Sequence, residues 1–199
     1  PILSLLIFIP LIGAAVILFM GSDRHRKAIC WTATVAATVV FVLSIGAWVM
    51  FVPGQAGMQL TELADWIDAL NIHDYLQFGR PHPKGSVGDT LLSLLSIIYS
   101  WRITDRIKEY MIFFLLLETG VVGVFCALDF FLFYVFWEVS LVPMFFLIGI
   151  WGGPNRHYAA IKFFIYTLIG SLAMLLGILA LYFASTPHTF DMIELARQH

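Results

Sequence analysis

Residues 130–151 read FFLFYVFWEVSLVPMFFLIGIW, an apolar run whose one formal charge is Glu138. A helix needs about 20 predominantly apolar residues to cross the hydrocarbon core of a bilayer, which is roughly 30 Å thick. The run meets that length, and an ionisable residue at such a depth is costly and usually functional. These residues therefore predict a membrane-spanning helix that carries a buried acid.

Apolar stretches of comparable length lie on both sides of this run. They cover residues 2–20, 28–52, 110–127 and 158–183. Another stretch, residues 91–101, is shorter, and even when extended to 87–103 it would reach only about 25 Å at about 1.5 Å per residue. The sequence therefore predicts an all-α membrane protein of about six transmembrane helices, of which the third is short.

The composition agrees with a protein whose solvent is the bilayer. Hydrophobic residues make up 60% of the 199 residues and charged residues 12%, whereas soluble domains carry about 25% charged residues. The net charge of −2, without a basic face, excludes a nucleic-acid partner. Cys30 and Cys126 lie inside apolar runs and the histidines lack metal-ligand spacing, so we expect neither a disulfide nor a metal site.

Basic residues gather in three short connections, which follow residues 20, 101 and 151. Because Lys and Arg in short loops mark the cytoplasmic side, the amino terminus is predicted to lie outside. Residues 1–52 should hold transmembrane helices 1 and 2, 53–89 an ordered external loop, 90–109 the short third helix and an inside loop, 110–184 helices 4 to 6, and 185–199 the start of a second external loop. The two ends of the chain have the appearance of a fragment.

Glu138 is the first candidate for proton transfer. It lies nine residues after Asp129, which is about 14 Å along a helix and near the middle of the membrane. Pro143 cannot donate a hydrogen bond to the carbonyl of Val139, so we expect a kink or local hydration beside Glu138. The alternatives are a permanently protonated carboxyl bonded to a neighbouring helix, and a proline kink without function.

Two further residues are candidates for a proton path. Glu118 lies eleven residues before Asp129, so a tight antiparallel hairpin brings it to nearly the depth of Glu138. If the two carboxyls face each other, repulsion and desolvation keep at least one of them protonated; the alternative is a protonated packing residue. Lys162 lies in the first turns of the last helix, beside His157, and could either snorkel to the interface or serve a proton path.

The second half of the chain carries a distinctive series of motifs. The chain reads LFYVFWE from Leu132, then VPM, then IWGG, and AAIKFFIYT from Ala159. These motifs resemble the antiporter-like chain M of NADH-quinone oxidoreductase (respiratory complex I) and the mitochondrial chain 4 family. The resemblance is close from Tyr110 onward and looser over residues 1–78.

The resemblance implies a fragment with about six helices of a larger antiporter-like helix bundle. Glu138 takes the position of the family's membrane-embedded proton-channel acid, whose partner lysine would lie on a later helix, and Lys162 matches a lysine of the family motif. The implied function is proton translocation coupled to electron transfer in partner subunits. NADH, FMN, iron–sulfur clusters and quinone are therefore expected in those subunits, and no cofactor in this chain.

The resemblance also implies a location in a bacterial cytoplasmic membrane, among lipid and other membrane subunits of one complex. Two alternatives remain open. Subunits of multisubunit cation/proton antiporters and membrane-bound hydrogenases share the Phe-Trp-Glu core, and a scaffold bundle could use buried acids only to fix helix register. Residues 79–89 (GRPHPKGSVGD) depart from the family's Gly-Val-Asp-Gly-like entry into a full third helix, which again favours a short one.

Overall fold

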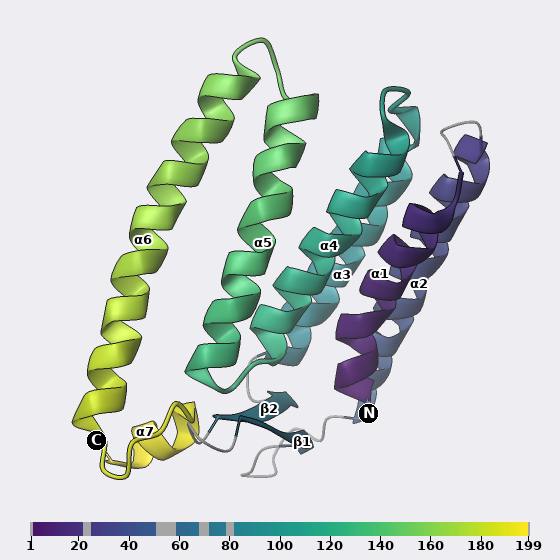
Figure 1. Cartoon of the computed structure of the whole chain (residues 1–199). Helices are drawn as coiled ribbons and strands as arrows, with labels where there is room; N and C mark the ends of the chain where they lie inside the picture. The colour runs from purple at the N-terminus through teal and green to yellow at the C-terminus, as the bar shows by residue number, and fades with distance from the viewer. Residues whose placement is uncertain (1, 22–24, 51–58, 68–71, 79–81, 199) are drawn as a thin grey trace.

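The computed structural model describes residues 2–21, 25–50, 59–67, 72–78 and 82–198. Within these ranges, long helices stand side by side, and a two-stranded hairpin and a short helix lie across one end (Figure 1). The elements are α1 (Ile2–Phe19), α2 (Arg26–Met50), β1 (Gln59–Ile67), β2 (Ile72–Phe78), α3 (His82–Tyr99), the 3-10 turn η3 (Ser100–Arg102), α4 (Ile107–Cys126), α5 (Phe130–Trp151), α6 (Arg156–Ala184) and α7 (Met192–Gln198).

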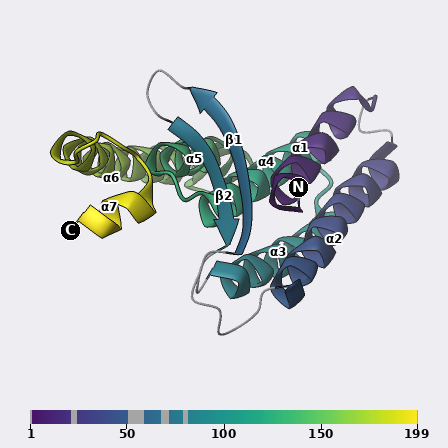
Figure 2. The same cartoon turned by 90° about the horizontal axis from the view of Figure 1, so that it is seen from below.

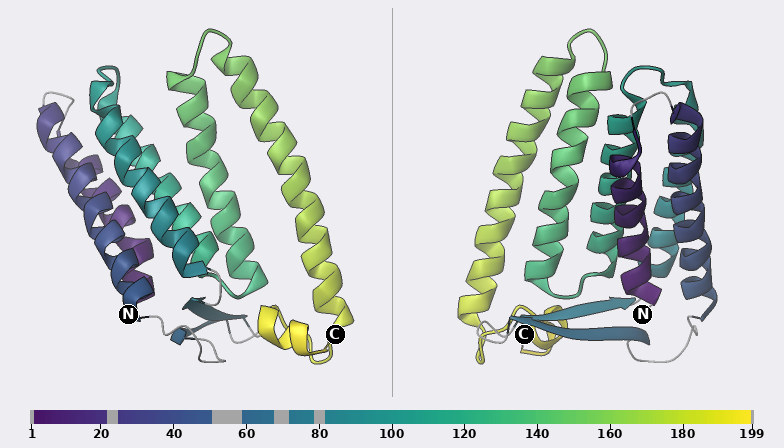
Figure 3. Two further views of the ribbon diagram at one scale, coloured as in Figure 1. Left: turned by 180° about the vertical axis from the view of Figure 1, so that it is seen from behind. Right: turned by 45° about the vertical axis from the view of Figure 1, so that its right-hand side comes forward.

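Five of these helices, α1, α2, α4, α5 and α6, are long and apolar enough to cross a membrane. They coincide with the five full-length stretches that the sequence predicts, so the all-α, multi-pass architecture is confirmed. Helix α3 has 18 residues, a reach of about 27 Å at about 1.5 Å per residue. It lies in the bundle beside α2 and α4 (Figure 3). However, its residues are not apolar enough for it to count among the five candidate membrane-spanning helices.

The predicted boundaries of 53–89 as a loop and 90–109 as the start of the third helix are wrong. Helix α3 begins at His82. Its early polar residues Ser86 and Thr90 are fully buried, and the Thr90 hydroxyl interacts with the Ser86 carbonyl at 2.9 Å and with the Ser44 hydroxyl of α2 at 2.8 Å. Because neighbouring helices cover these hydroxyls, a polar segment can run through the bundle without meeting lipid.

The hairpin replaces much of the predicted external loop. Strands β1 and β2 are antiparallel, with Leu63 opposite Tyr75 and Asp65 opposite His73. They cross beneath the helix ends, on the side where the amino terminus and α7 lie (Figure 2). Residues 51–58, 68–71 and 79–81 of the predicted loop lie outside the described residues.

The core of the molecule lies among α1 to α4. Ile17, Ile29, Ala33, Ile97 and Leu115 come from all four helices and are each 0% exposed. Small residues let the backbones approach, as at Gly13, where an added Cβ would lie 2.8 Å from the Ala36 Cβ. These contacts fix the rotation of α4 about its axis, and therefore decide where its acid points.

Glycines also fix the approach of α4 to α5. A Cβ on Gly120 would lie 2.9 Å from the Ser140 Cβ, and one on Gly123 would lie 2.3 Å from the Phe136 ring. Gly170 and Gly177 of α6 differ, because neither has a neighbour within 4 Å of an added Cβ among the described residues.

The α1–α2, α3–α4 and α5–α6 connections lie together at the end opposite the hairpin (Figure 3). This arrangement agrees with the predicted grouping of the basic residues, while which end faces the cytoplasm stays a prediction. At the hairpin end, the chain after α6 returns to the α4–α5 turn. The Phe130 N–H donates to the Phe190 carbonyl at 2.9 Å, and the Met192 N–H donates to the Leu128 carbonyl at 3.1 Å.

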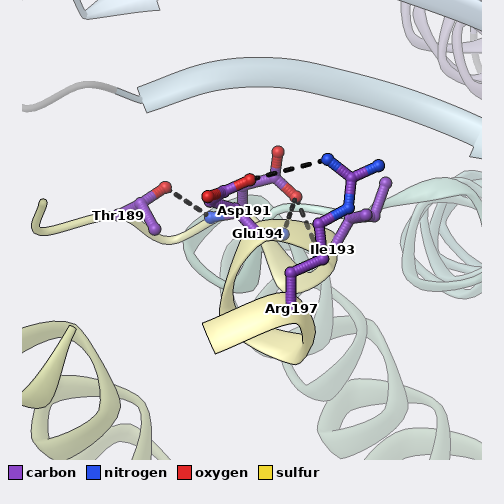
Figure 4. Close-up of polar contacts among 5 residues, drawn as sticks. All are labelled: Thr189, Asp191, Ile193, Glu194 and Arg197. Carbon is purple, nitrogen blue, oxygen red and sulfur yellow. Dashed lines mark hydrogen bonds and ion pairs between the residues drawn. The ribbon is translucent and has the colours of Figure 1, made fainter. Parts of the chain in front are cut away.

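Helix α7 begins at a cap formed within this returning segment. The Asp191 carboxylate accepts hydrogen bonds from the N–H groups of Ile193 at 2.7 Å and Glu194 at 3.4 Å (Figure 4). The Asp191 N–H in turn donates to the Thr189 hydroxyl at 3.1 Å, and Arg197 lies 3.8 Å from the Glu194 carboxylate. The predicted second external loop thus contains an ordered, capped helix.

Candidate functional site

Glu138 lies near the middle of α5, at the depth that the sequence predicts. Asp129 begins the helix, because its side chain accepts hydrogen bonds from the N–H groups of Phe131 at 2.7 Å and Leu132 at 3.1 Å. Nine residues later, about 14 Å along the axis, Glu138 is half-buried. Its Oε1 atom is buried and has no hydrogen-bond partner among the described residues.

Glu138 shares its surroundings with two hydroxyl groups. The Tyr134 hydroxyl, one helical turn earlier on α5, interacts with the Glu138 carboxyl and with the Ser171 hydroxyl of α6. Ser171 is 3% exposed, and its hydroxyl donates to the Leu168 carbonyl at 3.0 Å. These contacts place the Glu138 carboxyl at the junction of α5 and α6.

Pro143 is buried and lies one turn beyond Glu138. Because proline has no N–H, the Val139 carbonyl receives no hydrogen bond from residue 143. The Ser140 hydroxyl donates to the Trp137 carbonyl at 2.7 Å, and Ser140 packs against Gly120 of α4. Ser140 therefore faces α4, on the opposite side of α5 from the Glu138–Tyr134 contact.

Glu118 is more deeply enclosed than Glu138. It is 1% exposed, and neither of its carboxyl oxygens has a hydrogen-bond partner among the described residues. It shares a buried stripe of α4 with Leu115 and Val122, at spacings of three and four residues. Leu115 and Val122 pack in the clusters that α4 forms with α1 and α2, and the Glu118 carboxyl interacts electrostatically with that of Asp89 on α3.

The structure does not bring Glu118 and Glu138 face to face. The contacts of Gly120 with Ser140 and of Gly123 with Phe136 set Glu138 about one helical turn, or roughly 5 Å, from the level of Glu118. The two acids are therefore at similar depth. However, Glu118 lies about 200° around α4 from Gly120, the residue that touches α5, so its carboxyl is directed away from Glu138.

Lys162 lies on the outer side of α6. It is exposed, and its ammonium group lies 5.6 Å from the centre of the Tyr158 ring. An added Cβ at Gly149 would lie 3.5 Å from the Cβ of Ala160, which sets Glu138 level with Ser171 in this antiparallel pair. Lys162 is nine residues, or about 14 Å, from that level, so the described helices do not pair it with Glu138.

Sequence reasoning missed Asp89, Tyr134 and Ser171. Tyr134 could have been found, because it lies four residues before Glu138 on a predicted helix. Ser171 required the register of α5 against α6, and Asp89 lay in a segment that was predicted to be a loop. Within the described ranges, no group of three or more His, Cys, Asp or Glu residues could hold a metal ion.

Comparison with known sequences gives consistent matches. Residues 127–199 match the family described as NADH:quinone oxidoreductase/Mrp antiporter, TM. The chain is 40% identical to NADH-quinone oxidoreductase subunit M of Rhodobacter capsulatus over 98% of this chain and 38% of that protein. It is 39% identical to NADH-ubiquinone oxidoreductase chain 4 of Arabidopsis thaliana (91% and 37% covered) and 34% identical to F(420)H(2) dehydrogenase subunit M of Methanosarcina mazei (100% and 40% covered).

Solved structures share the fold. A chain of respiratory complex I from Thermus thermophilus superposes with a TM-score of 0.82 at 22% identity, over 97% of this chain and 38% of that one. A chain of an archaeal membrane-bound sulfane sulfur reductase gives 0.78 at 21% identity (96% and 29% covered), and a chain of the Mrp complex from Dietzia sp. gives 0.72 at 21% identity (94% and 20% covered). The chain spans about 40% of the length of the curated relatives that it matches.

Proposed function

Since this chain belongs to the family of subunit M, or chain 4, of NADH-quinone oxidoreductase, we propose that it contributes a proton-translocating step to such a complex. Electron transfer from NADH to quinone takes place in partner subunits, which hold the FMN and iron–sulfur clusters. This chain supplies membrane helices and titratable side chains, and its partners are the other membrane subunits and the surrounding lipid.

The observation that carries the proposal is the setting of Glu138. A carboxyl with a buried, unpartnered oxygen lies midway along a membrane-spanning helix. Intramembrane acids of this kind mark proton pathways, because the free energy of ionisation there depends strongly on nearby charge. Glu138 is therefore the residue proposed to exchange the proton.

The hydroxyl groups beside Glu138 supply a short route for that proton. Tyr134 contacts both Glu138 and Ser171, so its hydroxyl can accept a proton from one side while it donates its own to the other. Pro143 leaves the Val139 carbonyl free to bind water at the same depth. In this scheme Tyr134 and Ser171 orient the Glu138 carboxyl and relay its proton, and Glu138 is the group that changes charge.

Lys162 and Glu118 have different roles from Glu138 in this proposal. Lys162 is exposed on α6 and distant from Glu138 along the axis, so it acts on the proton path through an interface on the outer face of α6. Glu118 is enclosed among α1 to α4 and forms a separate site. The positive partner that Glu138 requires is assigned to a lysine on a later helix of the parent protein, as the family resemblance implies.

The test is Glu138→Gln in the full-length protein within its assembled complex. The amide keeps the shape of the carboxyl and cannot titrate, so proton translocation through this subunit should be abolished. The measurement is proton uptake into proteoliposomes during NADH oxidation, expressed per electron. Glu109→Gln is the matched control, because the Glu109 side chain is 41% exposed at the start of α4 and pairs only with Arg106 among the described residues. An unchanged proton-to-electron ratio for Glu138→Gln would defeat the proposal.

A second candidate is a subunit of a multisubunit cation/proton antiporter or a related redox complex with another electron donor. The fold shared with the Mrp and sulfane sulfur reductase chains favours it. Purification of the tagged parent protein in mild detergent separates the two, because NADH:quinone reduction should co-purify only with the first. If Glu138→Gln instead reduces assembly and leaves transport per complex intact, the chain is a scaffold bundle.

A further inference from the structure

Asp89 and Glu118 form a second buried acid pair, on the side of α4 that faces away from Glu138. Asp89 lies on α3 and Glu118 on α4, and their carboxyls interact electrostatically. A Cβ added at Gly85 of α3 would lie 3.3 Å from the Phe125 ring of α4. Asp89 lies four residues, about 6 Å, beyond Gly85 on α3, and Glu118 lies seven residues, about 10 Å, before Phe125 on α4. In this antiparallel register the two acids are therefore within about 5 Å of one level along the bundle axis.

The pair is enclosed and its oxygen atoms lack partners. Both oxygens of Glu118, the Oδ2 atom of Asp89 and the Oγ atom of Ser86 are buried without a hydrogen bond among the described residues. Ser86 is 0% exposed and lies one turn before Asp89, toward the end of the bundle where the hairpin lies. Buried polar atoms in folded proteins are nearly always satisfied, so this cluster is built to hold something.

Among the side chains that the structure describes, those of the surrounding helices offer no positive charge to the pair; the side chain of Lys84, near the start of α3, lies outside this description. Helix α1 carries no titratable side chain, and the described hydroxyls of α2 and α3 beside the pair, Ser44 and Thr90, bond to each other. The described Lys and Arg side chains in α2 and α4 and in the α3–α4 connection lie toward the opposite end of the bundle; they are Arg26, Lys27, Arg102, Arg106 and Lys108. Tyr134 and Glu138 of α5 face α6.

Two ionised carboxylates without a neighbouring cation repel each other strongly in a medium of low polarity. One proton removes the repulsion, because a protonated carboxyl donates a hydrogen bond to the ionised one and both acids gain a partner. We propose that Asp89 and Glu118 hold a single proton between them, in a buried proton site between α3 and α4. The site does not depend on proton pumping through Glu138.

Infrared difference spectroscopy on the full-length protein in detergent tests this proposal. The wild-type protein should show one protonated-carboxyl band at neutral pH that both Asp89→Asn and Glu118→Gln remove, because either new amide donates the hydrogen bond that the shared proton made. The spectrum of the variant with both substitutions should lose no further protonated-carboxyl band. Two separate bands, each lost with its own residue, would mean two independently protonated acids and overturn the shared proton, as would spectra that none of the variants changes.

Two further measurements keep the outcome clear. Ser86→Ala retains both acids and should shift the frequency of the band while leaving its intensity; loss of the band in this variant would contradict a proton held by Asp89 and Glu118 alone. Replacing choline with sodium ions at fixed pH should leave the wild-type band unchanged. Loss of the band in sodium would identify a metal-cation site and overturn the assignment to a proton. Glu109→Gln serves as the control.

Discussion

Helices α1 to α4 enclose a shared apolar core, whereas α5 and α6 extend from α4 in a row (Figure 2) and contribute few fully buried residues. Ile17, Ile29 and Leu115 of the first group are 0% exposed, while Tyr166 and Leu176 of α6 are 81% and 69% exposed. Membrane helices associate through close packing and polar contacts rather than through exclusion of water. The first group therefore has a core of its own, while its outer residues, such as Phe19 at 88% exposed, need the same cover of lipid or protein as α6.

The two acids follow the same division. Glu118 lies inside the core of α1 to α4, where the charged group that it faces among the described residues is Asp89, a second acid. Glu138 lies at the α5–α6 junction beside exposed neighbours, Trp137 at 40% and Val139 at 41%. A partner from outside these helices can reach Glu138 and not Glu118, so regulation by a moving charge is expected at Glu138.

The largest expected difference between the regions is in the cost of removing a leucine side chain. Leu115→Ala should destabilise the full-length protein by about 2–5 kcal/mol, because it leaves a cavity among α1, α2 and α4. Leu176→Ala should cost less than about 1 kcal/mol if lipid covers α6. The measurement is the midpoint of unfolding in detergent at several temperatures. If the two variants lose equal stability, another part of the full-length protein covers α6. The difference in burial between the two groups of helices would then hold only for residues 1–199.

The next effect concerns the close approach of helices. Gly123→Ala should destabilise by about 1–3 kcal/mol, because the new methyl group overlaps the Phe136 ring. Gly46→Ala on α2 is the matched control, since nothing lies within 4 Å of an added Cβ there, and it should be neutral or slightly stabilising. Unfolding of both variants under the same conditions provides the measurement. A harmless Gly123→Ala would mean that α4 and α5 are not tightly fixed.

A smaller effect is expected at the hydroxyl beside Glu138. Tyr134→Phe removes one hydroxyl and keeps the ring, so stability should change by about 1 kcal/mol or less. The rate of proton uptake by the reconstituted complex should fall several-fold, because Glu138 loses its link to Ser171. Tyr182→Phe is the control at the hairpin end of α6. If the two variants pump protons alike, Tyr134 does not serve as a relay.

The smallest effect is expected at Lys162. Lys162→Met keeps the length of the side chain and removes its charge, and an exposed amine that can reach the interface contributes less than about 1 kcal/mol to stability. Proton uptake by the complex should fall only slightly. A loss as complete as that of Glu138→Gln would place Lys162 on the main proton path and would show that the outer face of α6 is a functional interface.

Much of this architecture is predictable because bilayer thickness fixes helix length. The five long apolar stretches and the central depth of Glu138 follow from spacing along the chain. The short connection at Asp129 also predicts that Glu118 and Glu138 lie at similar depth, as observed.

The remaining features depend on rotation and burial, which spacing does not determine. Helix α3 begins earlier than predicted because Ser86 and Thr90 are buried between helices. At such positions polar side chains are compatible with a helix in the membrane. Glu118 turns toward Asp89 because the core contacts of Leu115 and Val122 set the rotation of α4. Lys162 faces outward because Ala160 occupies the contact with α5.

The returning segment after α6 has a mechanical consequence. The chain closes the α5–α6 pair at one end through residues 152–155, and the backbone hydrogen bonds of Phe190 and Met192 to the α4–α5 turn close it at the other. Two helices joined at both ends cannot separate by rotating about a hinge at one end. If Glu138 transfers protons as proposed, water and protons should reach it through rearrangement of side chains and local unwinding at Pro143, while the two helices stay together.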